Sequence, residues 1–68
     1  MMNLYIFDNG DGAYGKGVIF HIDYEDGTRC YRGREVFYGY SWREIVNKIR
    51  ERARELTGKR NFHTTCYR

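Results

Sequence analysis

The chain has 68 residues, of which 41% are hydrophobic and 18% aromatic, and its formal net charge is +3. This length supports one small core, which excludes a second domain, and the apolar content excludes the intrinsically disordered class. Because no run approaches the ~20 apolar residues of a membrane span and the N-terminus lacks a secretion signal, we expect one soluble, cytoplasmic domain, residues 1–68. In that compartment Cys30 and Cys66 are expected to be reduced.

Two strands are predicted in the first third of the chain. Residues 3–8 form a hydrophobic run, and residues 17–24 (GVIFHIDY) alternate apolar and polar side chains with the period of two that a half-buried strand requires. A glycine-rich segment, residues 10–17, connects them. We expect this segment to be a flexible loop, because glycine tolerates backbone conformations that other residues avoid.

The middle of the chain predicts a hairpin. The pair Asp26-Gly27 favours a tight turn, so residues 29–32 are expected to return antiparallel to the preceding strand. Gly33 and Arg34 are expected to end that strand, and residues 36–40 to form a further short one.

A helix over residues 42–57 is predicted by a capping signal at its start, an apolar stripe along one face and a glycine after its last residue. Ser41-Trp-Arg-Glu44 has the spacing of a capping box, and Gly58 supplies a stop. Apolar residues recur at helical spacing between them: Trp42, Ile45, Val46, Ile49, Ala53 and Leu56. Residues 61–67 are expected to add a last strand.

These elements predict an α+β fold in which an antiparallel sheet of four to five short strands carries one amphipathic helix packed on one face. The side chains expected to meet the helix are Leu4, Ile6, Val18, Phe20, Ile22, Cys30 and Val36. Those expected on the other, unusually aromatic face are Tyr5, Phe7, Ile19, His21, Arg29, Tyr31 and Phe37. Two alternatives remain open: the glycine-rich segment folds over part of this face, or the register of a strand is shifted by one residue.

Cationic side chains are concentrated in the second half of the chain. Residues 1–27 carry five acids and one lysine, a charge of −4, whereas residues 28–68 carry eleven Lys or Arg and four Glu, a charge of +7. Nine of the twelve cations are Arg, which pairs bidentately with phosphate or carboxylate and stacks on rings. This distribution favours a polyanionic partner, and the alternative is a solvated face without a partner.

The sequence gives little support for catalysis or for a cofactor. The segment GDGAYGKG matches G-x-G-x-x-G, but a strand follows where a dinucleotide loop requires a helix, and Asp8 and Asp11 would repel phosphate. His21, Cys30, His63 and Cys66 lack the close cysteine pairs of a structural zinc site. We therefore expect a protein that is not an enzyme and that holds no metal or cofactor.

The remaining signal is the mixture of arginine and aromatic residues in RCYRGREVFYGYSWR, residues 29–43, to which the helix adds a basic flank. In such a mixture the arginines pair with phosphate and the aromatic rings stack on bases. The same residue types are also enriched in protein interfaces. The candidate partner-binding residues are Arg29, Tyr31, Arg32, Arg34, Tyr38, Tyr40, Arg43, Lys48 and Arg52.

Two resemblances bear on function. The order of residues 3–6, a glycine turn, a strand, Asp26-Gly27-Thr28-Arg29, Phe37 and Ser41 before a helix resembles the arm-type DNA-binding domains of phage integrases. That resemblance implies a sheet inserted into the major groove of DNA, although residues 62–67 are extra to the pattern.

The second resemblance is of type only. A small, basic, aromatic chain without enzyme machinery resembles the phage-encoded anti-CRISPR proteins, which implies binding to a CRISPR surveillance complex so that target DNA is blocked. We therefore expect a non-catalytic phage or mobile-element accessory protein that binds a nucleoprotein complex, DNA or RNA. A homodimeric protein-interaction module is the alternative.

Overall fold

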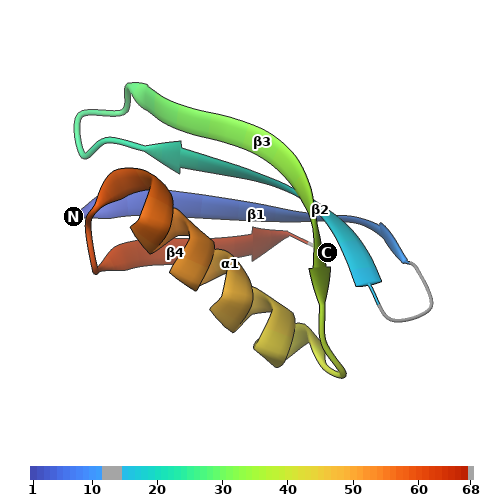
Figure 1. Ribbon diagram of the computed structural model, residues 1–68. Helices are drawn as coiled ribbons and strands as arrows, with labels where there is room; N and C mark the ends of the chain where they lie inside the picture. The colour runs from blue at the N-terminus through green and yellow to red at the C-terminus, as the bar shows by residue number, and fades with distance from the viewer. Residues whose placement is uncertain (12–14, 68) are drawn as a thin grey trace.

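Four strands and one helix make up the protein, whose computed structural model describes residues 1–11, without the side chain of Asp11, and residues 15–67. In chain order the elements are β1 (Met2–Asp11), β2 (Gly15–Asp23), β3 (Arg29–Tyr38), α1 (Trp42–Thr57) and β4 (Phe62–Tyr67). The strands form one sheet in the order β3-β2-β1-β4, with α1 packed against one face (Figure 1). The fold is therefore α+β, as the sequence predicts, with four strands.

The first three strands form an antiparallel meander. Both the β1–β2 and the β2–β3 pairs are antiparallel, which confirms the expected return of the chain after Gly27. The turn after β2 is closed by hydrogen bonds from the Tyr24 amide to the Thr28 carbonyl (2.8 Å) and from the Gly27 amide to the Tyr24 carbonyl (2.9 Å). Gly27 has a φ of 93°, a conformation that glycine adopts without steric cost.

The fourth strand corrects the expectation of a purely antiparallel sheet. β4 pairs parallel to β1, from Met2 opposite Phe62 to Phe7 opposite Tyr67, so the sheet is mixed. The path of α1 is the physical reason for this parallel pairing. After β3 the chain returns through α1 to the end of the sheet where β3 begins, so the strand that follows runs in the direction of β3 and β1.

The helix has the predicted start, stripe and end. The Ser41 hydroxyl accepts a hydrogen bond from the Glu44 amide (3.2 Å), while Gly58 ends the helix at a φ of 70°. The Glu44 carboxylate accepts from the amide of Tyr40 (3.1 Å) rather than that of Ser41, so the capping box is displaced by one residue. No helix in the described parts of the chain is both long and apolar enough to cross a membrane.

The core lies between α1 and the sheet. Three helix residues, Ile45, Ile49 and Ala53, are buried against it, while Trp42, Val46 and Leu56 pack at its margin. The buried sheet residues are Met2, Leu4, Ile6, Val18, Phe20, Ile22, Phe37 and Phe62. The predicted helix-facing residues of β1 and β2 are thereby confirmed.

The third strand departs from the expected alternation. It is continuous through Gly33, and its pairing with β2 skips Cys30, so a bulge places Cys30 and Tyr31 in succession against the core. The bulge shifts the remaining side chains by one position. Phe37 is therefore buried on the helix side, and Val36, expected in the core, is 56% exposed on the other face.

The glycine-rich segment is mostly strand rather than loop. β1 extends to Asp11 and β2 begins at Gly15, with Asp11 opposite Lys16 and an irregularity between Asp8 and Asp11. Residues 12–14 of the motif lie outside the described residues. The strand pairing on both sides of them leaves Gly15 and Gly17 in β2, so this segment does not open a helix as a dinucleotide loop does.

Candidate nucleic-acid interface

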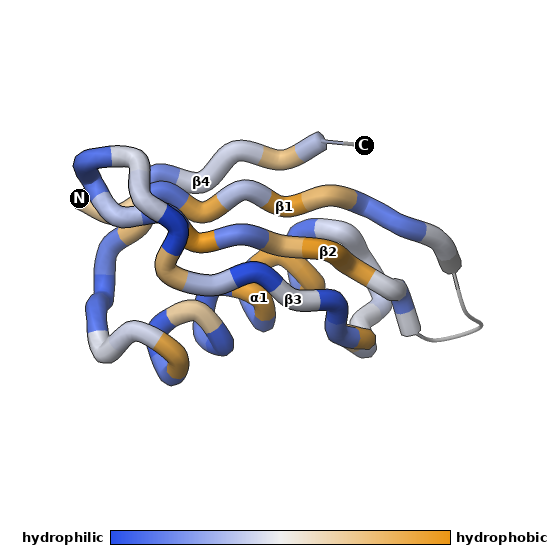
Figure 2. The backbone as a smooth tube through the Cα atoms, turned by 90° about the horizontal axis from the view of Figure 1, so that it is seen from above, coloured by the Kyte–Doolittle hydropathy of each residue, from blue (hydrophilic) through white to orange (hydrophobic). Residues whose placement is uncertain are grey.

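One face of the sheet carries no helix, and we refer to it as the open face. Because paired residues on neighbouring strands point to the same side, the register defines its members. They include Tyr5, Phe7, Ile19, His21, Arg29, Arg32, Arg34, Val36, Tyr38 and Tyr67. Each is half-buried or exposed. Figure 2 looks onto this face, with α1 lying beneath the sheet.

Aromatic rings form a row across three strands of the open face. The Tyr67 ring on β4 is stacked on the Phe7 ring of β1, with 4.8 Å between centroids and 7° between planes. The centroid of the Phe7 ring also lies 5.0 Å from that of the His21 ring on β2. The Tyr5 ring lies 6.5 Å from the same His21 ring, in an edge-to-face arrangement. The parallel pairing of β4 with β1 creates this row, because it brings Tyr67 opposite Phe7.

Arginines occupy the β3 margin of the same face. Arg32 is paired with His21 and Arg34 with Ile19, so both residues lie on the same face as the aromatic row. Arg29 is held by Asp23 through its Nε at 2.9 Å from Oδ1. Arg32 and Arg34 are exposed and two residues apart, about 6.8 Å along the strand.

Side chains of β3 lie across two glycines of β2, and at Gly15 there is no room for a Cβ atom. A Cβ at Gly17 would lie 3.5 Å from Nη2 of Arg34, and a Cβ at Gly15 would lie only 2.8 Å from Cε1 of Tyr38. The Tyr38 ring thus lies over Gly15, with 62% of the residue still exposed. Among the described glycines of the G-x-G-x-x-G spacing, Gly15 therefore serves packing on the open face.

His21 stands at the centre of the face and is held neutral. Desolvation by its surroundings, and then the positive charges of Arg29 and Arg32, lower the pKa of His21 below its usual 6.5, against an opposing effect of Asp23. The open face therefore presents arginine charge beside uncharged rings near neutral pH.

Tyr31 and Arg52, both predicted contacts, lie on the helix side instead. The Tyr31 ring crosses Gly33 on the helix side of β3, and its hydroxyl donates to Oε2 of Glu35 (3.1 Å). Burial, and then this hydrogen bond, raise the pKa of Tyr31. Arg52 from α1 pairs with the same carboxylate, with Nε 3.0 Å from Oε1. This network joins β3 to α1, which corrects the expected outward direction of Tyr31.

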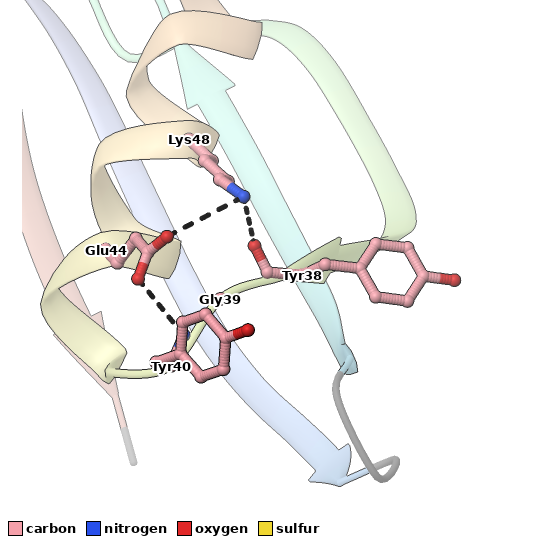
Figure 3. A pocket seen from close by; sticks show the side chains of 5 residues that line it. All are labelled: Tyr38, Gly39, Tyr40, Glu44 and Lys48. Atoms are coloured by element: carbon pink, nitrogen blue, oxygen red, sulfur yellow. Dashed lines mark hydrogen bonds and ion pairs between the residues drawn. The ribbon is translucent and has the colours of Figure 1, made fainter.

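Tyr40 and Lys48 lie beside a pocket of about 180 Å³ at the start of the helix, lined by Tyr38, Gly39, Tyr40, Glu44 and Lys48 (Figure 3). The Lys48 amine donates to the Tyr38 carbonyl and lies 3.9 Å from Oε1 of Glu44. Tyr40 is 95% exposed. The predicted contact Arg43 is exposed on the first turn of α1, away from the arginines of β3.

The histidines and cysteines considered for a metal site are dispersed. Cys30 and Cys66 lie on the two edge strands, with β2 and β1 between them, which excludes a disulfide between them in one chain. His21 lies on the open face, whereas Cys30 packs against the core. Within residues 1–11 and 15–67, no group of three or more His, Cys, Asp or Glu side chains could hold a metal ion.

The register thus places Arg29, Arg32, Arg34 and Tyr38 on the open face. Of the other predicted contacts, Tyr31 and Arg52 lie on the helix side, whereas Tyr40 and Lys48 line a pocket beside Tyr38. Phe7, His21 and Tyr67 also lie on this candidate interface, although none of them is among the predicted partner-binding residues. Alternation on β1 and β2 already indicated the direction of Phe7 and His21, but the position of Tyr67 depends on parallel pairing across a long connection.

Comparisons with family models, curated proteins and solved structures found no match to this chain.

Proposed function

We propose that the protein is a non-catalytic binding protein whose open face takes nucleic acid, either free or within a nucleoprotein complex. The observation that supports this most strongly is the meeting of exposed arginines with a row of aromatic rings on one uncovered sheet face. Guanidinium groups pair with phosphate, and rings stack on bases, so this combination fits both parts of a nucleotide.

The charge of the open face fits a polyanion. Arg29, Arg32 and Arg34 lie along one strand, and Asp23 is an acid beside them that already pairs with Arg29. Arg32 and Arg34 are therefore the side chains proposed to contact phosphate. Each phosphate contact releases counterions, so the affinity is expected to fall linearly with salt on logarithmic axes.

The test replaces both arginines at once. Arg32→Glu with Arg34→Glu is expected to weaken binding to a labelled oligonucleotide at least about tenfold and to flatten the salt dependence, because two phosphate contacts are lost. Arg43→Glu with Lys59→Glu makes the same change of charge on α1 and the connection after it, and should change affinity by less than about threefold. Equal losses in both double variants would indicate a general effect of net charge and remove the proposed surface.

A second candidate is a protein that inhibits a nucleoprotein complex, of which a CRISPR surveillance complex is the specific case. The exposed apolar residues Val36, Tyr38 and Tyr40, which are 56%, 62% and 95% exposed, favour it because aromatic residues are enriched in protein interfaces. They adjoin the arginines of β3, so a partner with both protein and nucleic acid could contact both groups.

Purification of partners from a host lysate separates the two candidates. With nuclease present, an inhibitor should still recover a defined effector complex, and Tyr40→Ala should reduce that recovery. Recovery of nuclease-sensitive material alone would favour general nucleic-acid binding. A concentration-dependent mass without affinity for nucleic acid would instead support the homodimeric alternative.

A further inference from the structure

We propose that the open face binds single-stranded rather than double-stranded nucleic acid, with phosphates along Arg32 and Arg34 and bases against Tyr38 and the Tyr67 end of the ring row. This inference rests on the proposed function and names its ligand class. It is carried by the width of the sheet, by the exposure of two rings and by the position of the cations.

The sheet is too wide for the major groove of DNA. Four strands about 4.8 Å apart place the outer strands about 14 Å from each other, before their side chains are counted. The major groove of B-DNA is about 12 Å wide. β4 contains the residues that are extra to the integrase-like pattern, and it adds Tyr67 to the face. A fourth strand therefore works against groove insertion.

The exposed rings need unpaired bases as partners. Tyr38 lies across Gly15 with 62% of its surface exposed, and Tyr67, stacked on Phe7, is 49% exposed. In a duplex the faces of the bases are covered by their neighbours in the stack, so such rings would gain no stacking contact. A single strand can turn its bases onto a sheet and leave its phosphates at the margin.

The cations are placed for this arrangement. Arg32 and Arg34 follow one edge strand at alternate positions, and the ring row lies across β2, β1 and β4 on the other side of them. A strand whose backbone follows β3 would direct its bases toward the rings. His21, uncharged and in contact with Phe7, would lie beneath the bases as a further flat group.

The experiment compares four labelled probes by fluorescence anisotropy at fixed salt. They are a mixed-sequence single strand of about twelve nucleotides, as DNA and as RNA, the duplex of the same sequence, and an abasic strand of the same length. We expect a DNA or RNA single strand to bind at least about tenfold more tightly than both the duplex and the abasic strand, because only it supplies phosphates together with free base faces.

Variants then locate the stacking contacts. Tyr38→Ala and Tyr67→Ala should each weaken single-strand binding about fivefold or more, whereas Tyr24→Ala, the matched control at the turn after β2 with 47% of its surface exposed, should change it less than about twofold. Duplex or abasic probe bound as tightly as the single strand would overturn this inference but leave the proposed function standing. No binding of any probe would overturn both. Since the abasic comparison uses the unaltered protein, it does not depend on how the variants fold.

Discussion

Gly33 and Gly15 lie where a neighbouring tyrosine ring leaves no room for a Cβ atom. A Cβ at Gly33 would lie 2.3 Å from the Tyr31 hydroxyl oxygen and 2.7 Å from its Cζ, so any other residue must displace the ring. That ring packs 5.4 Å from Phe20 and donates to Glu35, which also pairs with Arg52. Gly33 thus controls the contact between β3 and α1.

We predict that Gly33→Ala lowers the free energy of unfolding by about 1 kcal/mol, because losing a hydrogen bond to a charged group outweighs the gain from removing a flexible glycine. Gly15→Ala is the matched control. There the displaced ring is that of Tyr38, which is exposed and can turn away, so the change should stay within about 0.5 kcal/mol. Urea unfolding measures both, and equal losses would contradict this role for Gly33.

The lowered pKa of His21 predicts a specific dependence of stability on pH. When the pH falls below about 6.5, the unfolded chain takes up a proton at this site before the folded protein does, so stability decreases until the folded pKa is passed. Above about pH 7.5 both states are neutral there and the effect is absent. His21→Gln should therefore flatten the curve of unfolding free energy between about pH 7 and pH 5. An unchanged slope in this variant would contradict the account.

At the scale of elements, side-chain capping by Ser41 and Glu44 determines where the helix begins. The Ser41 hydroxyl satisfies the Glu44 amide, which has no partner inside the helix, and Glu44 in turn accepts from Tyr40. Ser41→Ala should cost about 1 kcal/mol of stability, whereas Ser41→Asp, which keeps an acceptor, should cost much less. Thermal unfolding of the two variants provides the comparison, and identical midpoints would show that the cap contributes nothing.

The helix and the first two strands could be predicted from the sequence because local signals specify them. Capping residues, a stripe at helical spacing and strict alternation act within a few residues of one another. The alternation on β3 could not be predicted beyond Cys30, since one bulge reverses the direction of every later side chain. The parallel direction of β4 depends on the path of α1 across the sheet, which no local pattern encodes.

The candidate interface, too, could be predicted where local composition indicates it, but not where it depends on register or on packing. Arg32, Arg34 and Tyr38 belong to the segment that the sequence indicated, because its mixture of arginine and aromatic residues is visible in any register. The bulge places Tyr31 on the helix side, whereas simple alternation along β3 predicts the open face. Arg52, on a predicted basic flank, is held by Glu35 and Glu55 at 3.0 and 3.2 Å, so its pairing became apparent only with the packing of α1.

At the scale of the whole molecule, the two faces of the sheet have different surroundings. The helix covers one face of the sheet and buries the core, and its cations Lys48 and Arg52 are engaged by neighbouring carboxylates. The other face carries no helix (Figures 1 and 2), and the strand register places its rings and its β3 arginines there. We infer that binding can occur on the open face without disturbing the core.

A site-resolved NMR titration of the 8.2 kDa protein with a short single-stranded oligonucleotide tests this claim most directly. We predict that the largest shifts occur at the Arg32 and Arg34 Nε–H groups, the His21 ring and the Tyr67 ring, while the α1 amides from Ile45 onward stay nearly unchanged. Shifts concentrated on α1, or none at saturating oligonucleotide, would contradict the assignment of the open face as the nucleic-acid interface.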